Sequence, residues 1–513
     1  MSCSTDVLAR ITAGEVFSEV NLSNRGLTEF PMELLKLQDS LEVLNLGGNN
    51  LSSLPPEVSC FRKLRILFFA GNKFEVMPEQ LGSLSSLYML SFKSNKLTHI
   101  PPDSLSPSVG WLILTDNSLT KLPDTIGNLR GLRKLMLANN RLSELPRSMS
   151  RCTDLELIRL SRNKLSELPL FLLDLPKLSW ISLAGNCIPG MIESHSGGGA
   201  LSARGPTVPL SALCVGPKIG EGASGYVHET KWKSEEDYFR HMCDGASSSG
   251  TSTSQWGNLL GSDGSPFAYK VFKGQCGSDG HPEDEIKACM DVGYHCNILS
   301  AAACVVNEDT SANESDAASS PMVLTGLLLP LIPPSCISLG GTPSFVSVTR
   351  DVYEPTACYS PLFVGNVLSG ISSAMKHLHS RGMLHGDLYA HNIHIYPDGT
   401  PLLMDFGASF QCDMEVLCDE FALLQRLEVR AFGCLVEELL ARMQPANGDM
   451  SATELTAASV EKQPQQVREI SEGVRKSFSL SMLRDACTQT SIKSRPSFDS
   501  ICDAIGPATH LSY

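Results

Sequence analysis

Two carboxylates and one carboxamide lie close together in the second half of the chain. Asp387 and Asn392 belong to the segment Leu384–Asn392 (LHGDLYAHN), and Asp405 belongs to Leu402–Gly407 (LLMDFG). Transfer of a phosphoryl group needs a carboxylate that accepts the proton of the attacking hydroxyl. It also needs oxygen ligands that hold Mg²⁺ against the β- and γ-phosphates. The residue types therefore indicate phosphoryl-transfer chemistry.

The spacing of these residues makes the indication specific. Asn392 follows Asp387 by five residues and Asp405 follows it by eighteen. The stretch resembles the protein kinase signature H-R-D-L-x-x-x-N followed by D-F-G. The resemblance implies that ATP is the phosphoryl donor, that Asp387 is the catalytic base and that Asn392 and Asp405 are Mg²⁺ ligands. For any of these residues taken singly, the alternative is a loop residue that forms a cap or a turn.

A glycine-rich stretch, Ile219–Val227, fits the kinase pattern G-x-G-x-x-G-x-V. Dinucleotide-binding folds carry a similar pattern, but there the glycines must open a helix. The following residues, Tyr226–Trp232, are rich in strand formers, which favours a strand–turn–strand. The resemblance makes the following residues candidates for ATP binding: Ile219, Gly220, Glu221, Gly222, Ala223, Ser224, Gly225, Tyr226 and Val227.

Lys270 lies in Ala268-Tyr269-Lys270-Val271, which resembles the kinase strand whose lysine pairs with the α- and β-phosphates. Taken alone it would be read as a surface lysine on an edge strand. Pro282 followed by acidic residues predicts a helix start. The resemblance places on that helix a glutamate that pairs with the lysine, and Glu285 is the candidate. Lys270 and Glu285 therefore complete the predicted catalytic and ATP-binding residues.

Three departures from the kinase pattern affect regulation and substrate choice. Gly386 replaces the arginine that normally receives an activation-segment phosphate, and Ser409 is the only hydroxyl residue between Gly407 and Glu420. Together they predict activity that is not gated by activation-segment phosphorylation. Tyr389 stands where serine/threonine kinases place a lysine. The sequence at this position therefore does not decide which class of hydroxyl residue accepts the phosphoryl group.

The third departure is the length of the activation segment. Only a short run separates Asp405 from Glu428–Gly433, which resembles the start of a central helix of the family. Little chain remains to dock a peptide substrate. Arg495 resembles the arginine of the closing motif of the family, and Glu420 is its candidate partner.

The first part of the chain repeats itself from Val20. The pattern L-x-x-L-x-L-x-x-N-x-L returns at steps of 22 or 23 residues. It resembles the leucine-rich repeat family, in which stacked repeats form one continuous core. An asparagine ladder would satisfy backbone groups, whose burial without a partner costs roughly 1–3 kcal/mol. Arg25 replaces the asparagine in the first unit, which suits an atypical terminal repeat. The asparagines of the repeat are Asn49, Asn72, Asn95, Asn117, Asn140, Asn163 and Asn186.

Side chains alternate along a strand, so the residues beside each central leucine face the concave side. Several of them are apolar where solvent would be expected. An exposed apolar patch usually marks a protein partner site, and the alternative is packing on the rest of the same chain. The predicted partner-binding residues are Ile66, Phe68, Trp111, Ile113 and Trp180.

Composition limits the remaining classes. The net charge of −14 argues against a general nucleic-acid surface. The start of the chain lacks the pattern of a secretory signal, and the most apolar run is broken by prolines, so a cytoplasmic chain without a membrane span is expected. Seventeen scattered cysteines without a Cys-x-x-Cys pair predict reduced thiols.

The predicted fold is an α/β leucine-rich-repeat solenoid followed by an α+β bilobal protein-kinase-like domain. The expected function is transfer of the γ-phosphoryl group of Mg·ATP to protein hydroxyls, with serine/threonine favoured by general frequency and with the repeat recruiting the protein substrate or a partner. The alternative is a pseudokinase scaffold, and a pure binding solenoid with an inert tail is a third possibility. The predicted segments are 1–19 (N-terminal), 20–190 (solenoid), 191–212 (flexible linker), 213–505 (kinase domain, with N-lobe 213–332, disordered insertion 234–266 and C-lobe 333–505) and 506–513 (tail).

Overall fold

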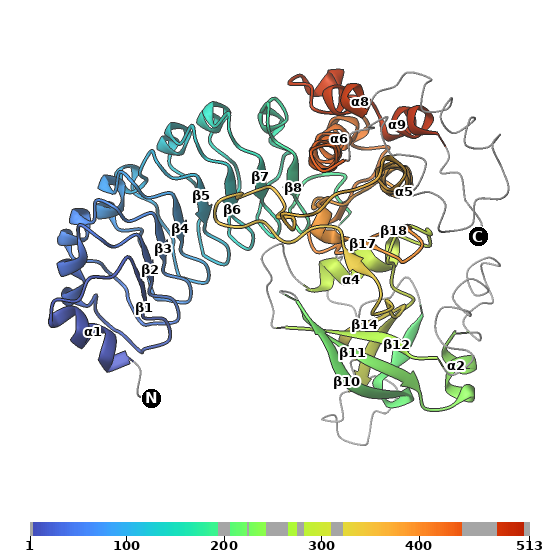
Figure 1. Cartoon of the computed structure of the whole chain (residues 1–513), viewed down its shortest axis with the longest axis horizontal. Helices are drawn as coiled ribbons and strands as arrows, with labels where there is room; N and C mark the ends of the chain where they lie inside the picture. The colour runs from blue at the N-terminus through green and yellow to red at the C-terminus, as the bar shows by residue number, and fades with distance from the viewer. Residues whose placement is uncertain are drawn as a thin grey trace, which may run out of the picture.

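The computed structural model describes residues 4–192, 206–222, 225–242, 265–273, 282–308, 322–443 and 480–506. Its first part, residues 19–192, is a solenoid whose eight short strands form one parallel sheet in chain order. The strands line the inner side of an arc (Figure 1). They are β1 (Glu19–Asn21), β2 (Val43–Asn45), β3 (Ile66–Phe68), β4 (Met89–Ser91), β5 (Trp111–Ile113), β6 (Lys134–Met136), β7 (Leu157–Arg159) and β8 (Trp180–Ser182).

Short 3-10 helices return the chain along the outer side of the solenoid. Each begins directly after the proline that the sequence places in every repeat, because proline fixes φ and suits the first turn. These helices are η1 (Met32–Leu37), η2 (Pro56–Cys60), η3 (Glu79–Ser83), η4 (Pro102–Ser104), η5 (Asp124–Asn128), η6 (Arg147–Arg151) and η7 (Leu170–Leu172). Helix α1 (Ser4–Thr12) covers the open end of the first repeat, with Ile11 fully buried.

The predicted asparagine ladder is confirmed. Asn140 Nδ2 donates to the carbonyls of Leu114 (2.9 Å) and Leu137 (3.0 Å), and its Oδ1 accepts from the Leu119 amide (3.1 Å). The other asparagines make the same kind of bond to the preceding repeat. These side chains are therefore structural, since they satisfy backbone groups that neighbouring strands leave unpaired.

A sheet part, residues 206–329, follows the solenoid. Its strands run in the order β10-β11-β12-β14-β13-β9, and all pairs are antiparallel except β13 with β9. Helix α4 (Pro282–Asp291) packs against β13. The strands are β9 (Thr207–Pro209), β10 (Leu213–Glu221), β11 (Gly225–Trp232), β12 (Phe267–Phe272), β13 (Ala303–Glu308) and β14 (Met322–Leu329), with η8 (Leu210–Ala212) between the first two.

The segment predicted as a disordered insertion, 234–266, is not disordered throughout. Residues Glu235–Met242 form helix α2, whose start is capped by the Ser234 hydroxyl accepting from the Asp237 amide at 3.1 Å. Tyr238 and Met242 are buried against the sheet. The polar composition of the segment concealed this amphipathic turn, and residues 243–264 lie outside the described part. The predicted loop over Asn307–Ser320 lies outside it as well, from residue 309 on.

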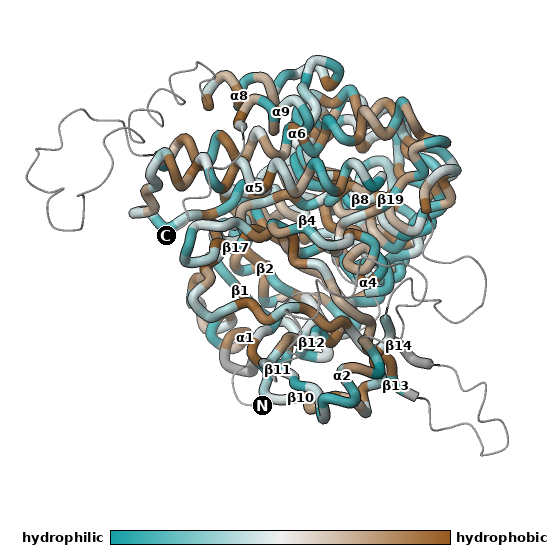
Figure 2. Tube along the Cα trace, turned by 90° about the vertical axis from the view of Figure 1, so that its right-hand side faces the viewer, coloured by the Kyte–Doolittle hydropathy of each residue, from teal (hydrophilic) through white to brown (hydrophobic). Residues whose placement is uncertain are grey.

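The helical part, residues 330–506, is built on two long helices, α5 (Pro361–Ser380) and α6 (Cys418–Leu440). Hydrophobic and hydrophilic residues are interspersed along both (Figure 2), which fits helices with one buried face. The remaining elements are β15 (Ile337–Ser338), β16 (Met383–Leu384), η9 (Ala390–Asn392), β17 (Ile393–Ile395), β18 (Pro401–Leu403), β19 (Phe410–Gln411), α8 (Leu480–Cys487), η10 (Ile492–Ser494) and α9 (Phe498–Ile505).

Two predictions in the helical part were wrong. Helix α6 begins at Cys418, ten residues before the expected start at Glu428. Arg495 does not pair with Glu420: its guanidinium donates to the carbonyls of Gln489 (2.8 Å) and Arg426 (3.1 Å). Both errors have one cause, since the residues expected to form the end of an activation segment are the first turns of α6.

The solenoid and the helical part share one hydrophobic core. Leu417, Phe421 and Leu424 pack with the leucines of the last repeats. The Ile192 amide donates to the Gln411 carbonyl (2.9 Å), and the Asp413 amide donates to Gly190 (2.7 Å). The sequence predicted a repeat that moves freely about a linker over 191–212. Instead, the helical part closes the end of the solenoid, and residues 193–205 of that linker lie outside the described residues.

Candidate active site

Lys270 and Glu285 form an ion pair between the sheet and helix α4. Lys270 lies on the central strand β12, and its Nζ contacts Glu285 Oε1. Burial alone would lower the pKa of Lys270, but the negative charges of Glu285 and Asp405 raise it. Asp405 thus lies close enough to act on the same ammonium group, although it comes from the helical part.

The glycine-rich turn lies beside Lys270. Val227 on β11 is the register partner of Lys270, and Gly220 on β10 is the register partner of Val227. A Cβ on Gly225 would lie 2.3 Å from the Val271 carbonyl, so only glycine fits there. The predicted strand–turn–strand is confirmed by β10 and β11. Ala223 and Ser224, at the tip of the turn, lie outside the described residues.

Other predicted residues of this turn are placed on its exposed side. Ile219 and Tyr226 are exposed, and Glu221 pairs with Lys218 and Lys273. Lys218 and Lys273 also lie over the ring of Tyr226, at 5.1 Å and 4.3 Å. The turn therefore combines exposed backbone with positive charge, which suits phosphate oxygens.

Asp387 and Asn392 lie together in one loop, the Asp387 loop (residues 385–392). Asn392 Nδ2 donates to both the carbonyl and the Oδ2 atom of Asp387, at 2.9 Å each. The buried His385 ring holds the loop from below, with Nε2 at 3.0 Å from the Met404 carbonyl. His385 is fully buried, which fits a packing residue. Ser409 is also buried and donates to the His385 carbonyl (2.9 Å).

Asp405 connects the two halves of the site. Its charge acts on Lys270 from one side and on His391 of the Asp387 loop from the other. Asn392 and Asp405 offer a carboxamide and a carboxylate oxygen, a donor set that suits Mg²⁺, which keeps several waters and binds through one or two protein oxygens plus phosphates. The described residues contain no cluster of three or more His, Cys, Asp or Glu side chains that would form a metal site of protein ligands alone.

The solenoid covers Asp387 from the other side. Arg159, on β7, pairs with Asp387 Oδ1 and donates through Nη1 to the Gly386 carbonyl at 2.8 Å. Trp180, on β8, donates through Nε1 to the Leu388 carbonyl at 2.9 Å. Its ring stacks on Tyr389, with centroids 4.3 Å apart and planes 7° apart.

These contacts change the electrostatics of the loop. Burial alone would raise the pKa of Asp387, but Arg159 and, after it, His391 and His385 lower it. Burial alone would lower the pKa of His391, but its hydrogen bond to Asp351 and the charges of Asp351 and Asp387 raise it. Asp387 is therefore held as a carboxylate of low basicity.

Residues 341–352 form a loop (the 341–352 loop) that makes a second contact with the solenoid. Two backbone hydrogen bonds between Gly341 and Val352 close this loop. The segment reaches across to the concave strands β5–β7 (Figure 1). The Phe345 ring lies 6.1 Å from Phe68 and 6.3 Å from Trp111. Thr349 donates to Glu156 and accepts from Arg133 at 2.9 Å.

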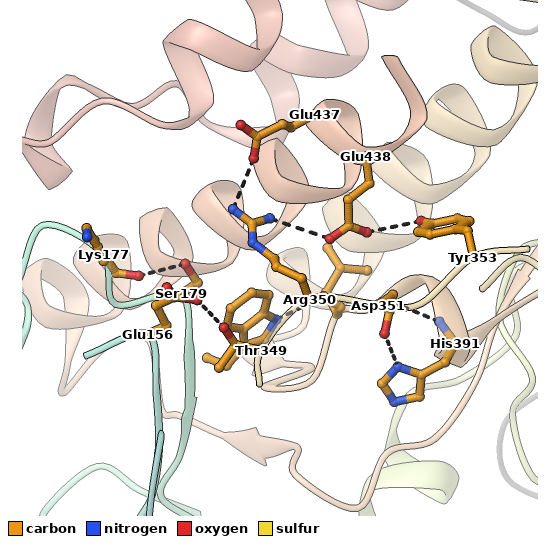
Figure 3. A network of polar contacts seen from close by, with 12 residues as sticks. Glu156, Lys177, Ser179, Thr349, Arg350, Asp351, Tyr353, His391, Glu437 and Glu438 are labelled. Atoms are coloured by element: carbon orange, nitrogen blue, oxygen red, sulfur yellow. Dashed lines mark hydrogen bonds and ion pairs between the residues drawn. The ribbon is translucent and has the colours of Figure 1, made fainter. Parts of the chain in front are cut away.

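The same loop is tied to α6 and to the Asp387 loop (Figure 3). Arg350 bonds Glu437 (3.0 Å) and lies 3.5 Å from Glu438, which also accepts from the Tyr353 hydroxyl at 3.0 Å. Asp351 accepts from the His391 amide (3.1 Å) and lies 2.6 Å from His391 Nδ1. The 341–352 loop thus connects the concave face to the residues around Asp387.

The five residues predicted to bind a partner lie at the ends of concave strands, as expected. Trp180 is only 2% exposed, Phe68 and Trp111 contact Phe345, and Ile113 packs against the core that includes Trp180. These four residues pack on the same chain, which is the alternative that the sequence left open. Ile66 is half-buried, and its role as a partner residue stays a prediction.

Sequence reasoning missed Arg159, Phe345, Thr349 and Asp351. Arg159 stands in the concave row, so its direction was predictable, but nothing in the repeat indicates what covers it. The other three lie in a loop without a recognisable motif. Their partners are more than 190 residues away in Arg133, Glu156 and Phe68, or lie in the Asp387 loop.

Leucine-rich repeat family profiles match residues 40–61, 107–165 and 130–188. The chain therefore contains leucine-rich repeats. A solved leucine-rich repeat protein of Leptospira interrogans is 29% identical and aligns over 36% of this chain and 52% of its own, with a TM-score of 0.30.

Two relatives from Dictyostelium discoideum are each named as a probable LIM domain-containing serine/threonine-protein kinase. One is 31% identical over 171 residues, and the other is 30% identical over 155 residues. The matches cover 30% and 27% of this chain but only 25% and 15% of the relatives. Within the described ranges, no helix is long and apolar enough to cross a membrane.

Proposed function

We propose that this chain is a protein kinase that transfers the γ-phosphoryl group of ATP to a protein hydroxyl, with serine/threonine as the favoured acceptor class. The observation that carries the proposal is the Lys270–Glu285 ion pair with Asp405 close enough to raise the pKa of Lys270. The pairing of Asp387 with Asn392 in the adjoining loop supports it.

In this account Lys270 binds the α- and β-phosphates and is held in place by Glu285. The glycine-rich turn covers the phosphates with backbone amides. Asn392 and Asp405 would hold Mg²⁺, which neutralises the charge that develops on the phosphate oxygens.

Asp387 accepts the proton of the acceptor hydroxyl while the oxygen of that hydroxyl forms a bond to the γ-phosphorus. The bond from that phosphorus to the β,γ-bridging oxygen breaks, and ADP leaves with the electron pair. The solenoid would recruit the protein substrate or another protein partner, with Ile66 as the concave residue for which this role stays a prediction.

The second candidate is a pseudokinase scaffold, and one observation favours it. Arg159 and Trp180 cover Asp387 and Tyr389, so the site for an acceptor hydroxyl is occupied by the chain itself. In that case the protein binds nucleotide or nothing and acts as an interaction platform.

The test compares purified wild type with Lys270→Met and Asp387→Asn in two assays. Binding of Mg·ATP, followed by thermal shift, is expected in wild type and Asp387→Asn and is expected to be lost in Lys270→Met. Phosphate transfer to a generic protein substrate is expected to fall by roughly 10²–10⁴ in Asp387→Asn, because the general base is gone. Equal transfer by all three proteins would indicate a contaminating kinase and contradict the proposal.

A further inference from the structure

Both carboxylate oxygens of Asp387 already have a donor. Oδ1 is paired with Arg159 of the solenoid, and Oδ2 accepts from Asn392. A bond from Asn392 belongs to the same loop and is compatible with the proposed catalysis. The guanidinium is different, because it is positively charged, comes from another part of the chain and covers Oδ1, the oxygen that Asn392 does not use.

A second bond of the guanidinium fixes it in this position. Its Nη1 atom donates to the Gly386 carbonyl at 2.8 Å, and Arg159 is only 2% exposed. Arg159 is therefore held beside Asp387 Oδ1 from two directions.

The backbone around Asp387 is shaped to receive the solenoid. Gly386 has a φ of +74°, and a Cβ there would lie 2.6 Å from the Ala408 carbonyl and 2.9 Å from the Ile181 carbonyl of β8. Any other residue would therefore push the last strand of the solenoid away. The glycine that replaces the motif arginine is the residue that admits β8.

We propose that Arg159 is a residue of the catalytic site, supplied by the solenoid, that holds Asp387 away from the acceptor hydroxyl and keeps the enzyme in a restrained state. This inference rests on the proposed kinase function. It assigns the solenoid a second role beside recruitment, because the row of side chains that faces a partner also reaches the proposed catalytic base.

The shared core indicates which part moves when the restraint is released. Leu417, Phe421 and Leu424 bury the end of the solenoid in the helical part, so separation of the two parts would expose apolar surface. The contact of Arg159 itself consists of its bonds to Asp387 and to the Gly386 carbonyl, so release requires only that these bonds are broken. The 341–352 loop is the neighbouring element that this release would involve, since Thr349 bonds Arg133 and Glu156 beside it.

The experiment measures steady-state phosphorylation of a generic protein substrate by wild type and Arg159→Ala, each checked for folding by circular dichroism. Arg159→Ala is expected to be faster by about tenfold or more, with the roughly 10²–10⁴-fold contribution of a general base as the upper limit. Lys177→Ala is the control. It removes another ion pair of the solenoid, to Asp154 at 2.6 Å on the exposed surface, without touching Asp387 or α4, and is expected to match wild type.

Arg159→Met keeps the apolar stem of the side chain and serves if Arg159→Ala does not fold. It also provides a second readout. The increase should appear in kcat/KM for the protein acceptor, while KM for Mg·ATP stays as in wild type, because Lys270 and Glu285 are unchanged. A change in stability alone would not produce this split.

The outcomes separate the two proposals. Binding of Mg·ATP by wild type and by the Arg159 variant, with no increase in rate, overturns the inference about Arg159 and leaves nucleotide binding intact. Absence of Mg·ATP binding in every variant overturns the kinase proposal and the inference with it. A faster Arg159→Ala that stays fast when Asp387→Asn is added would also contradict the inference, because the gain must depend on Asp387.

Discussion

Two ion pairs lie on opposite sides of the candidate site and differ in where their partners come from. Lys270 pairs with Glu285, fifteen residues away, within the sheet part and its own helix. Asp387 pairs with Arg159, 228 residues away, in the solenoid. The first pair leaves the exposed glycine-rich turn accessible beside it. The second lies beside Trp180, which stacks on Tyr389, and the Asp387 side chain keeps 17% of its surface exposed.

The comparison of the two pairs shows that sequence motifs alone do not determine whether the proposed catalytic base is accessible. The Lys270–Glu285 pair is assembled from groups that the sheet part and its helix supply. The acceptor side depends on whether a distant repeat is in place. A chain can therefore hold every residue of a phosphoryl-transfer signature and still have its proposed base occupied.

The largest expected effect concerns the contact of Trp180 with the Asp387 loop. Trp180→Ala removes a buried indole that stacks on Tyr389 and donates to Leu388. Loss of a buried tryptophan costs about 3–5 kcal/mol of unfolding free energy. Chemical denaturation should show that loss.

Trp111→Ala is the matched control within the same concave row. Its ring is only half-buried and meets Phe345 and Lys134, so a loss of about 1 kcal/mol is expected. Equal losses for the two variants would mean that the end of the solenoid is no more tightly docked than its middle.

The next effect is a pH dependence of the acceptor side. Burial, aided by Asp351, raises the pKa of Glu438 to about 7 from an ordinary value of 4.5. The folded state therefore binds a proton more tightly than the unfolded state. The protonated Glu438 therefore stabilises the folded state fully below pH 4.5, and this contribution is lost as the pH rises to 7.

Glu438→Gln should remove that slope. The stability of wild type relative to the variant should fall by up to about 3 kcal/mol between pH 4.5 and pH 7. Unfolding curves across this range check the prediction. Parallel pH profiles for the two proteins would show that Glu438 is not held in the buried network with Arg350 and Tyr353.

The nucleotide side gives the third prediction. Mg·ATP at about 100 times its dissociation constant should stabilise wild type by about 2.7 kcal/mol. Asp405→Asn should lose most of this gain, because it removes a Mg²⁺ ligand. Arg159→Met should retain it, since Arg159 belongs to the other side. A loss of the gain in Arg159→Met would abolish the distinction between the two sides.

The smallest effect concerns the contact of the 341–352 loop with the concave strands. Phe345 is 53% exposed and its ring is tilted against those of Phe68 and Trp111, so Phe345→Ala should cost about 1 kcal/mol. Val346→Ala is the control, since that side chain is 88% exposed and should not change stability. Identical results for the two variants would show that the 341–352 loop does not dock through Phe345.

The sequence allowed the solenoid to be predicted nearly residue by residue. Each repeat places leucine and asparagine at fixed positions, and each interaction joins neighbouring repeats, so the pattern contains its own contacts. The strand Lys134–Met136 and the bonds of Asn140 follow directly from it. The pair Lys270–Glu285 was also predictable, because both residues lie in segments with a recognisable motif.

The contacts between regions were not predictable in the same way. Arg159 occupies a position where other repeats carry Ile113 or Met136, and a repeat pattern does not encode what lies opposite. Phe345 and Thr349 lie in an irregular loop, where no period constrains the side chains. The first turn of α6 was missed because Cys418–Phe421 lies in the stretch expected to be an activation segment.

The measurement that tests the central claim most directly is a double-mutant cycle between Arg159 and Asp387. Unfolding free energies are compared for wild type, Arg159→Met, Asp387→Asn and the double variant. A coupling energy of about 1.5–3 kcal/mol is expected, because the two groups form a partly buried, hydrogen-bonded ion pair. Additive losses within about 0.5 kcal/mol would show that the solenoid does not hold Asp387.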